Sequence, residues 1–436
     1  MRLFRPRIAL MSAAPTPRHD SYAALRIPDF RRLISARVCL IVATRVQGLV
    51  ISWQIFKLTN DPLALGLIGL AEAIPSISVS LYAGHVADTV RRKNIIVAAV
   101  TVLVLCAAAL WGFASPFGIG LLAKESLYTL PLYSIIFMSG IARGFLGPAL
   151  FSFMPQLLPM REQLANAVTW NSTTYQAAAV LGPAIGGYLI AHLGVTSSYA
   201  IATGLLMLAL LQFLRIASRP LPPIEGEKLG LKDSVLSGMQ FIFNNQLVLA
   251  ALSLDLFAVL FGGAVALLPV FAVDILKVGA AGLGHLEAAP AVGSVLMAVV
   301  LTYFPLRRHA GRKLLWAVAG FGLATILFAL STNFWLSLFL LFLTGVFDAV
   351  SVIVRSTLLH TFTPEYMKGR VSAVNNIFIG SSNEIGSFES GAAARLMGVV
   401  PSVVFGGGMT LLVVGITAWR ADKLRRLDMT PETTKA

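Results

Sequence analysis

Long apolar segments recur along the whole chain, and they constrain its fold more than any other feature. Each has about 20 residues, the length that a helix needs to cross roughly 30 Å of hydrocarbon. Because a backbone in lipid must satisfy its hydrogen bonds within one segment, each is predicted to be a helix. The segments are continuously apolar rather than alternating, which excludes a β-barrel. The twelve expected spans cover residues 34–56, 63–83, 95–114, 129–153, 167–192, 196–214, 247–273, 281–303, 314–331, 334–359, 371–397 and 401–419.

The composition excludes most classes of soluble protein. Of the 436 residues, 57% are hydrophobic and 12% are charged, whereas a soluble chain carries about 25% charged residues. A net charge of +14 would suggest a nucleic-acid partner in a soluble protein, but a mean hydropathy of +0.79 does not fit a domain presented to water. The two cysteines, Cys39 and Cys106, both lie in apolar segments, so no disulfide scaffold is expected.

The distribution of Lys and Arg predicts the orientation. With the N-terminus placed inside, the outer loops hold only Lys57, Lys124 and Lys277 of the 34 basic residues, and most of the others lie in inner segments. This bias predicts an even number of spans with both termini in the cytoplasm. We therefore expect a multi-pass membrane protein, and the net charge is explained without nucleic acid.

The composition changes at residues 218–233, where three prolines and six charges interrupt the apolar sequence. We therefore expect an all-α protein with two six-helix bundles, residues 34–217 and 246–420, a pairing typical of secondary transporters. A cytoplasmic segment (1–33), a linker (218–245) and a cytoplasmic tail (421–436) complete the chain. The linker is expected to hold an amphipathic helix on the inner face, although a lead-in to the seventh span fits equally well. Its apolar residues at helical spacing are Leu231, Val235, Met239, Ile242 and Phe243.

Two motifs resemble those of the major facilitator superfamily. GHVADTVRRK at 84–93 resembles the superfamily's G-x-L-A-D-R-x-G-R-K loop between the second and third helices. AVLGPAIGG at 179–187 resembles the fifth-helix motif G-x-x-x-G-P-x-x-G-G of its antiporters, with Ala178 in place of the first glycine. Runs in the second half are similar to the branch that exports the siderophore enterobactin and drug-like compounds. The matching positions are Gly84, Ala87, Asp88, Arg92 and Lys93 in the loop, and Gly182, Pro183, Gly186 and Gly187 in the fifth helix.

The resemblance implies a carrier in the cytoplasmic (inner) membrane of a bacterium. It also implies that this carrier works by alternating access, acts as a monomer and needs no cofactor or metal. It implies that Gly84, Asp88, Arg92 and Lys93 form a cytoplasmic latch that breaks when the protein opens inward. It also implies exporter chemistry for the fifth-helix motif. The small residues of that motif form a ridge that allows close helix packing in any case, so the motif does not by itself fix the direction of transport.

Ionisable residues within spans are the main candidates for a functional site, because each costs at least about 2.5 to 3.5 kcal/mol to insert. Asp348 and Arg355 are seven residues apart, about 10 Å along a helix, which is too far for direct pairing. A buried structural ion pair is an equally good interpretation of any one of these residues. The candidates for proton coupling are Glu72, Asp255, Asp348, Glu384 and Glu389, and the candidate charge partners are Arg45, Arg143 and Arg355.

The eleventh span is unusually polar and must line a cavity or pack inside the protein. Its acids Glu384 and Glu389 have Arg143 and Arg45 as candidate partners. Aromatic residues deep in the spans could stack on a substrate or pack in the core. The candidates for a substrate cavity are Trp170, Tyr175, Asn376, Phe378 and Asn383.

These features favour a proton-driven exporter of a siderophore or a drug-like small molecule, with protons, that molecule and the lipid bilayer as partners. A proton-coupled uptake symporter would use the same parts with the coupling reversed. A polytopic receptor or membrane enzyme is a weaker alternative, because the sequence contains no GxxxxGK[ST], HExxH or GxSxG motif.

Overall fold

The described chain is built almost entirely of α-helices. The computed structural model describes residues 20, 22–116, 118, 129–220, 231–304, 306, 309–364 and 367–428. Before the linker lie η1 (Ala24–Arg26), α1 (Pro28–Thr59), α2 (Pro62–Thr89), α3 (Arg92–Ala114), α5 (Leu130–Phe153), η2 (Met154–Leu157), η3 (Arg161–Gln163) and α6 (Leu164–Leu214). After it lie α7 (Leu231–Asn244), α8 (Gln246–Phe261), η4 (Ala264–Leu267), α9 (Leu268–Val270), η5 (Phe271–Ile275), α10 (Gly279–Tyr303), α11 (Ala310–Leu330), α12 (Phe334–Phe362), α13 (Lys368–Met397), α14 (Val399–Arg420) and α15 (Asp422–Arg425).

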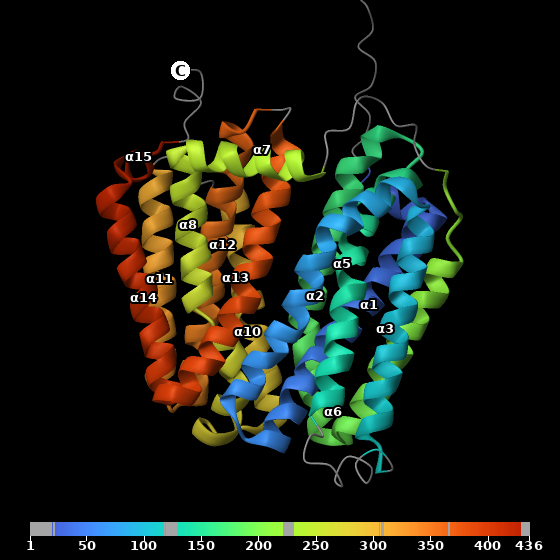
Figure 1. Cartoon of the computed structure of the whole chain (residues 1–436), viewed down its shortest axis with the longest axis horizontal. Helices are drawn as coiled ribbons and strands as arrows, with labels where there is room; N and C mark the ends of the chain where they lie inside the picture. The colour runs from blue at the N-terminus through green and yellow to red at the C-terminus, as the bar shows by residue number, and fades with distance from the viewer. Residues whose placement is uncertain are drawn as a thin grey trace, which may run out of the picture.

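The helices gather on two sides of the molecule. Figure 1 shows α1 to α6 on one side, here the N-terminal side, and α8 and α10 to α15 on the other, the C-terminal side. Helix α7 lies across the others at one end, which we call the α7 end. Arg370 near the start of α13 donates a hydrogen bond to Ser237 Oγ of α7. From there the 30 residues of α13 run about 45 Å to the opposite end, where Arg395 contacts Asp61.

Ten helices of the described chain are long and apolar enough to cross a membrane, which confirms the expected membrane fold. One of them, α6, has 51 residues and contains both expected spans 167–192 and 196–214. Non-helical backbone at Gly194, with φ at 80°, breaks it between these spans. Both ends of α6 lie near the start of α1, because Asn166 accepts a hydrogen bond from Ala24 N and the Arg215 carbonyl accepts one from Arg32. The chain therefore reverses its direction at Gly194.

The seventh expected span, 247–273, is not one continuous helix. Helix α8 ends at Phe261, and a 3₁₀ turn, a single α-turn and a π-turn carry the chain on to Ile275. Gly262 and Gly263 lie at the break and are buried enough to require partners for their backbone groups. The prediction of an unbroken helix is wrong here, because the apolar composition of the segment conceals the change in backbone conformation.

The hydrophobic core differs between the two ends of the molecule. One cluster of buried side chains draws on both sides, with Tyr199 from the N-terminal side and Phe271 from the C-terminal side. A second cluster, around Phe30 and Phe213, belongs to the N-terminal side alone. A third, around Leu358, belongs to the C-terminal side alone. The two sides therefore share a core away from α7, whereas toward the α7 end each has its own.

Helix α7 lies in the linker and packs one side against the C-terminal core. Ile242 is fully buried and Met239 packs partly against the C-terminal core, whereas Leu236 and Phe243 are exposed. A Cβ atom added at Gly238 would lie 2.9 Å from the Arg370 carbonyl oxygen, so α7 rests directly on α13. The side chains of Leu231 and Val235 lie outside the described part of the chain.

Candidate functional site

A cavity of about 660 Å³ lies between the two sides and is lined by α1, α2, α5, α6, α10 and α13. Among its lining residues the guanidinium groups come from the N-terminal side, while carboxylates come from both sides. A cavity wall this rich in charge inside a membrane bundle is a functional-site candidate. Its charged residues are Arg37, Arg45, Glu72, Arg143, Glu287 and Glu384.

Glu72 and Arg143 form an ion pair between α2 and α5 within this cavity. The helices come close here because α5 carries Gly140, where an added Cβ would lie 2.8 Å from the Glu72 carbonyl oxygen. Sequence analysis offered Arg143 as a partner for an acid of the eleventh span. The ion pair is instead with Glu72, although Arg143 remains within electrostatic range of Glu384.

Arg45 connects the small-residue ridge of α6 to the acids of the C-terminal side. Its side chain packs against Gly182, and its Nη2 donates a 3.2 Å hydrogen bond to Tyr175 Oη on the same helix. Arg45 also interacts electrostatically with both Glu287 and Glu384. One guanidinium from the N-terminal side therefore shares the cavity with two carboxylates from the other side and lies within electrostatic range of both.

Glu384 reaches from α13 across to α2. Its Oε2 would lie 3.3 Å from a Cβ built on Gly69, so the absence of a side chain at Gly69 makes room for the carboxylate. Glu72 and Glu384 also interact electrostatically, as two like charges that share the surrounding cations. The three acids and their arginines therefore form one coupled cluster, here called the central charge cluster: Arg45, Glu72, Arg143, Glu287 and Glu384.

Glu287 is the member of this cluster that sequence analysis missed. It lies within the expected span 281–303, where the cost of inserting an ionisable residue applies as it does to Glu72. The same criterion applied to every span would have found it. No local motif marks this position, because Ala288 and Ala289 follow it in an apolar helix.

Asp255 and Arg355 lie apart from the cavity. They form a buried ion pair between α8 and α12, with side-chain exposures of 9% and 5%. Ser351 Oγ lies 3.5 Å from Asp255 Oδ1. Arg355, which cannot reach Asp348 on its own helix, thus has its partner on another helix. Glu389 is half-buried on α13, five residues beyond Glu384.

The substrate-cavity candidates are dispersed. Tyr175 lines the cavity, whereas Asn383 lines a smaller chamber in the C-terminal side. Trp170 packs near Tyr22, with ring centroids 5.7 Å apart, in the core of the N-terminal side. Phe378 packs against the core of the C-terminal side. The side chain of Asn376 lies outside the described part of the chain.

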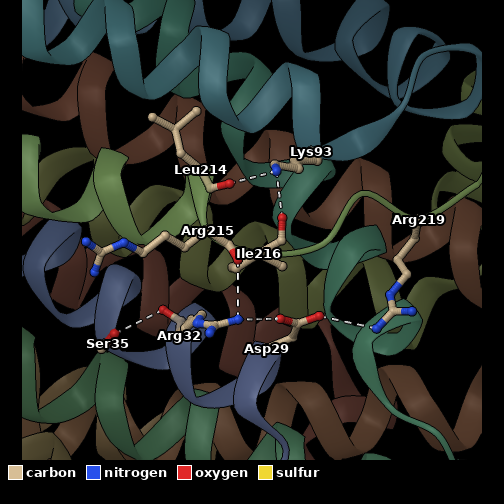
Figure 2. A network of polar contacts seen from close by, with 8 residues as sticks. All are labelled: Asp29, Arg32, Ser35, Lys93, Leu214, Arg215, Ile216 and Arg219. Carbon is tan, nitrogen blue, oxygen red and sulfur yellow. Dashed lines mark hydrogen bonds and ion pairs between the residues drawn. The ribbon is translucent and has the colours of Figure 1, made fainter.

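The basic residues of the loop motif bind helix ends on their own side. Lys93 Nζ donates hydrogen bonds to the carbonyls of Leu214 (2.9 Å) and Ile216 (2.6 Å) at the end of α6, as Figure 2 shows. Arg92 donates to the Ser152 carbonyl at the end of α5. The side chain of Asp88 and the surroundings of Gly84 lie outside the described part of the chain.

A second network holds α1 beside the end of α6 (Figure 2). The Asp29 carboxylate pairs with Arg32 Nη1 at 3.0 Å and with Arg219 Nη2 at 3.3 Å. Arg32 in turn donates to the Arg215 carbonyl at 3.3 Å. These contacts fix the helices of the N-terminal side to one another at the α7 end.

The fifth-helix motif packs against both sides. Ala178 is buried, Gly182 meets Arg45, and a Cβ added at Gly186 would lie 3.3 Å from Val46 Cα of α1. Gly187 faces α10 of the other side, where an added Cβ would lie 2.7 Å from Gly284 Cα. The carbonyl of Pro183 would lie 2.6 Å from a Cβ on Gly284. The ridge thus brings two helices from opposite sides into backbone contact.

The helical membrane fold and the charged central cavity define a transporter of the major facilitator superfamily. The chain belongs to its family of transmembrane secretion effectors, whose model matches residues 19–435. It is 28% identical over 416 residues to enterobactin exporter EntS of Shigella boydii serotype 18 and to that of Escherichia coli O81, covering 94% of this chain and 95% of each relative. These relatives are transporters, not enzymes.

Solved structures of transporters share the fold. The POT family transporter PepTSo has a TM-score of 0.71 at 14% identity, covering 92% of this chain and 99% of its own. A bacterial homologue of the human lysosomal transporter Spinster, in an inward-facing and unoccupied conformation, has a TM-score of 0.68 at 13% identity, covering 91% and 96%. The chain is accordingly a multi-pass membrane protein of transporter architecture.

Proposed function

We propose that this protein exports a siderophore or a drug-like small molecule across a bacterial inner membrane, in exchange for protons and by alternating access. The observation that carries the proposal is the central charge cluster, which places Arg45 of the N-terminal side in one cavity with Glu287 and Glu384 of the C-terminal side. The similarity to enterobactin exporters over almost the whole chain supports export of a siderophore.

Twelve spans in two six-helix halves fit the helices described. Nine of the ten apolar helices count as one span each, and α6 counts as two because of the reversal at Gly194. Helix α13, with 30 residues, is assigned as the twelfth, since Glu384 lines the cavity and Ser382 and Ser390 are buried. The halves correspond to residues 34–217 and 246–420, and a monomer contains the complete cavity.

Both termini are assigned to the cytoplasm, and the α7 end is the cytoplasmic end. The basic residues of the sequence concentrate in the segments that meet there, as the positive-inside rule requires. The shared core lies at the opposite end. This arrangement supports assigning the structure to the state that is open toward the cytoplasm, and export then requires the opposite end to open.

Proton exchange follows from competition for Arg45. Two carboxylates share the cavity with this one guanidinium, which can form a close pair with only one of them at a time. When the sides move apart, a carboxylate that loses its cation has to take up a proton to remain out of water. Glu287 and Glu384 are therefore proposed as the proton carriers, while Glu72 holds Arg143 in the wall of the cavity.

Transport into inside-out vesicles tests this function, with enterobactin as the probe. An exporter moves enterobactin into the lumen, so an acidic lumen should drive accumulation of enterobactin as protons leave. A proton ionophore should abolish the accumulation. Glu287→Gln and Glu384→Gln should lose accumulation but retain exchange of labelled for unlabelled enterobactin, because exchange needs no net proton movement.

Glu162→Gln is the matched control, since Glu162 is an exposed acid outside the cavity and the same change should leave accumulation intact. Accumulation that requires protons to move with the substrate would instead establish the uptake symporter. Uphill transport that persists in the Glu287→Gln, Glu384→Gln double variant would refute the proposed proton carriers. If folded protein moves no enterobactin in either direction, the siderophore assignment is wrong.

A further inference from the structure

A separate chamber of about 260 Å³ lies inside the C-terminal side, bounded by the broken seventh span and by α10, α11, α12 and α13. It adjoins the central cavity, because Val265, Pro290 and Ala291 line both. None of the members of the central charge cluster lines it. At roughly 30 Å³ for each water molecule, the chamber has room for a small ion with part of its hydration shell.

The break in the seventh span places the C-terminal end of α8 beside the chamber. The last helical hydrogen bond of α8 runs from Gly262 N to the Ala258 carbonyl at 2.9 Å. Val259, Gly262 and Gly263 at this end of α8 line the chamber. The carbonyls of Val259 and Leu260 lie against Gly386 of α13. The C-terminal end of a broken helix carries partial negative charge, and such ends bind cations in membrane carriers.

The hydroxyl groups around the chamber present oxygen acceptors rather than donors. A hydroxyl has one hydrogen, and each of these hydroxyls already donates it to a backbone carbonyl, which leaves only its lone pairs for a ligand. The bonds run from Ser294 to Gly345 (2.9 Å), Thr325 to Phe321 (2.9 Å), Thr344 to Leu341 (2.6 Å) and Ser387 to Asn383 (2.9 Å).

Asn383 contributes a further acceptor. Its amide nitrogen donates a 2.8 Å hydrogen bond to the Ile379 carbonyl. The amide oxygen is left for the chamber or its surroundings. The side chains that line the chamber thus supply mainly oxygen atoms that need a positively charged or donating partner.

Asp348 gives the chamber a negative charge with no cation to balance it. Among the described residues its carboxylate has no hydrogen bond or ion pair, and no Lys, Arg or His lines the chamber. Arg355 on the same helix is paired with Asp255. In the described part of the chain there is also no group of three or more His, Cys, Asp or Glu side chains that could hold a metal ion.

We propose that this chamber binds a monovalent cation, either an alkali ion such as Na⁺ or an alkylammonium group, through the Asp348 carboxylate and the surrounding oxygen atoms. One carboxylate matches one positive charge, and oxygen ligands suit hard cations. The site is distinct from the proton carriers of the central charge cluster, and its occupancy does not depend on which solute the protein transports.

Equilibrium binding of radioactive sodium to the purified full-length protein tests the proposal, with methylammonium chloride as competitor. The wild type should bind sodium saturably at about one ion per chain, and Asp348→Asn should weaken binding at least about tenfold. Thr344→Val should weaken it less, because it removes one neutral oxygen. Asp274→Asn is the matched control, since Asp274 is an exposed acid of the same broken span, and it should bind like the wild type.

The two sources of the cation give different results. Saturable sodium binding that methylammonium does not displace identifies an alkali-ion site. Saturable binding of radioactive methylammonium without sodium binding identifies an ammonium site. The proposal is overturned if neither binds saturably. It is also overturned if Asp348→Asn, eluting and unfolding like the wild type, binds with unchanged affinity. If Asp348→Asn does not fold, undiminished binding by folded Thr344→Val together with Asn383→Leu overturns it.

Discussion

Arg395 Nη1 at the end of α13 lies 2.8 Å from Asp61 Oδ2, immediately before α2. This ion pair joins the two sides at the end opposite α7. Asp61 Oδ1 also accepts a 2.9 Å hydrogen bond from Leu63 N, so a single carboxylate caps α2 and holds α13. Beside it, a Cβ added at Gly391 would lie 2.8 Å from Gly66 Cα. Opening at this end has to break the ion pair and separate the glycines.

We expect Arg395→Gln to make this opening easier while leaving the cap on α2 intact. The side chains of the pair are 58% and 32% exposed, so the pair stabilises the closed end by about 0.2 to 1 kcal/mol. Loss of the ion pair should raise the fraction of molecules that are open at this end by up to about fivefold. The rate at which an impermeant thiol reagent, added only from the side opposite α7 in sealed vesicles, labels Ser52→Cys measures that population, in a chain without its two native cysteines.

Arg425→Gln is the control for this measurement, because the ion pair of Arg425 with Asp422 lies within α15 and joins nothing across the two sides. Its labelling rate should equal that of the parent. A labelling rate in Arg395→Gln no higher than the parent's would mean that the pair does not hold this end closed.

The contact between Gly187 and Gly284 predicts a strong effect from one methyl group. Gly187→Ala would place its Cβ 2.6 Å from the Ala280 carbonyl oxygen, so α6 and α10 must move apart, at about 1 to 3 kcal/mol. The midpoint of thermal unfolding should fall. Gly204→Ala, in the same helix with no atom within 4 Å of the new Cβ, should be neutral or stabilising by about 0.5 to 1 kcal/mol. Equal midpoints for the two variants would show that the contact is not tight.

Sequence patterns predict the structural features that the lipid environment imposes on every helix. They fail for features that depend on how one helix packs against its neighbours. Apolar length alone predicts the spans, because lipid imposes the same condition on every helix. The pairing of Arg143 with Glu72 depends on how α2 and α5 are rotated against each other, which no spacing within one helix reveals. The break at Gly262 is hidden for a related reason, since its flanking residues are as apolar as those of a continuous span.

The same distinction explains which properties of the acidic residues in the spans could be predicted. Glu72, Glu384 and Asp255 were found because an ionisable residue in a span stands out, but their different surroundings were not predictable. Glu72 lies in the cavity, whereas Asp255 is buried with Arg355 in the C-terminal side. The free-energy cost of placing an ionisable residue in a membrane span indicates that the residue needs a partner. Only the packing of the helices shows which partner it has.

The Asp255 and Arg355 pair should be structural. Removing one partner leaves an unbalanced buried charge, so Arg355→Met should destabilise the protein by about 3 to 5 kcal/mol, whereas the Asp255→Leu, Arg355→Met double variant should recover most of that loss. Thermal unfolding of the three purified proteins measures both steps. The double variant should retain proton-driven transport. If it folds normally and loses only the coupling, Asp255 belongs with the proton carriers.

The hydrogen bonds of Lys93 predict how the loop motif contributes to the stability of the protein. Its ammonium group binds the carbonyls of Leu214 and Ile216, where the end of α6 carries partial negative charge. Lys93→Met should therefore lower the unfolding free energy by about 1 kcal/mol. Lys93→Arg should restore most of it, because a guanidinium can donate to the same carbonyls. Lys423→Met, which removes an exposed lysine of α15, should leave the unfolding midpoint unchanged.

The contacts of Lys93 join helices of one side only. The loss of stability in Lys93→Met should therefore appear in thermal unfolding, and the thiol labelling rate of Ser52→Cys should stay at the parent's value. A changed labelling rate at an unchanged unfolding midpoint would instead assign Lys93 to a latch between the two sides.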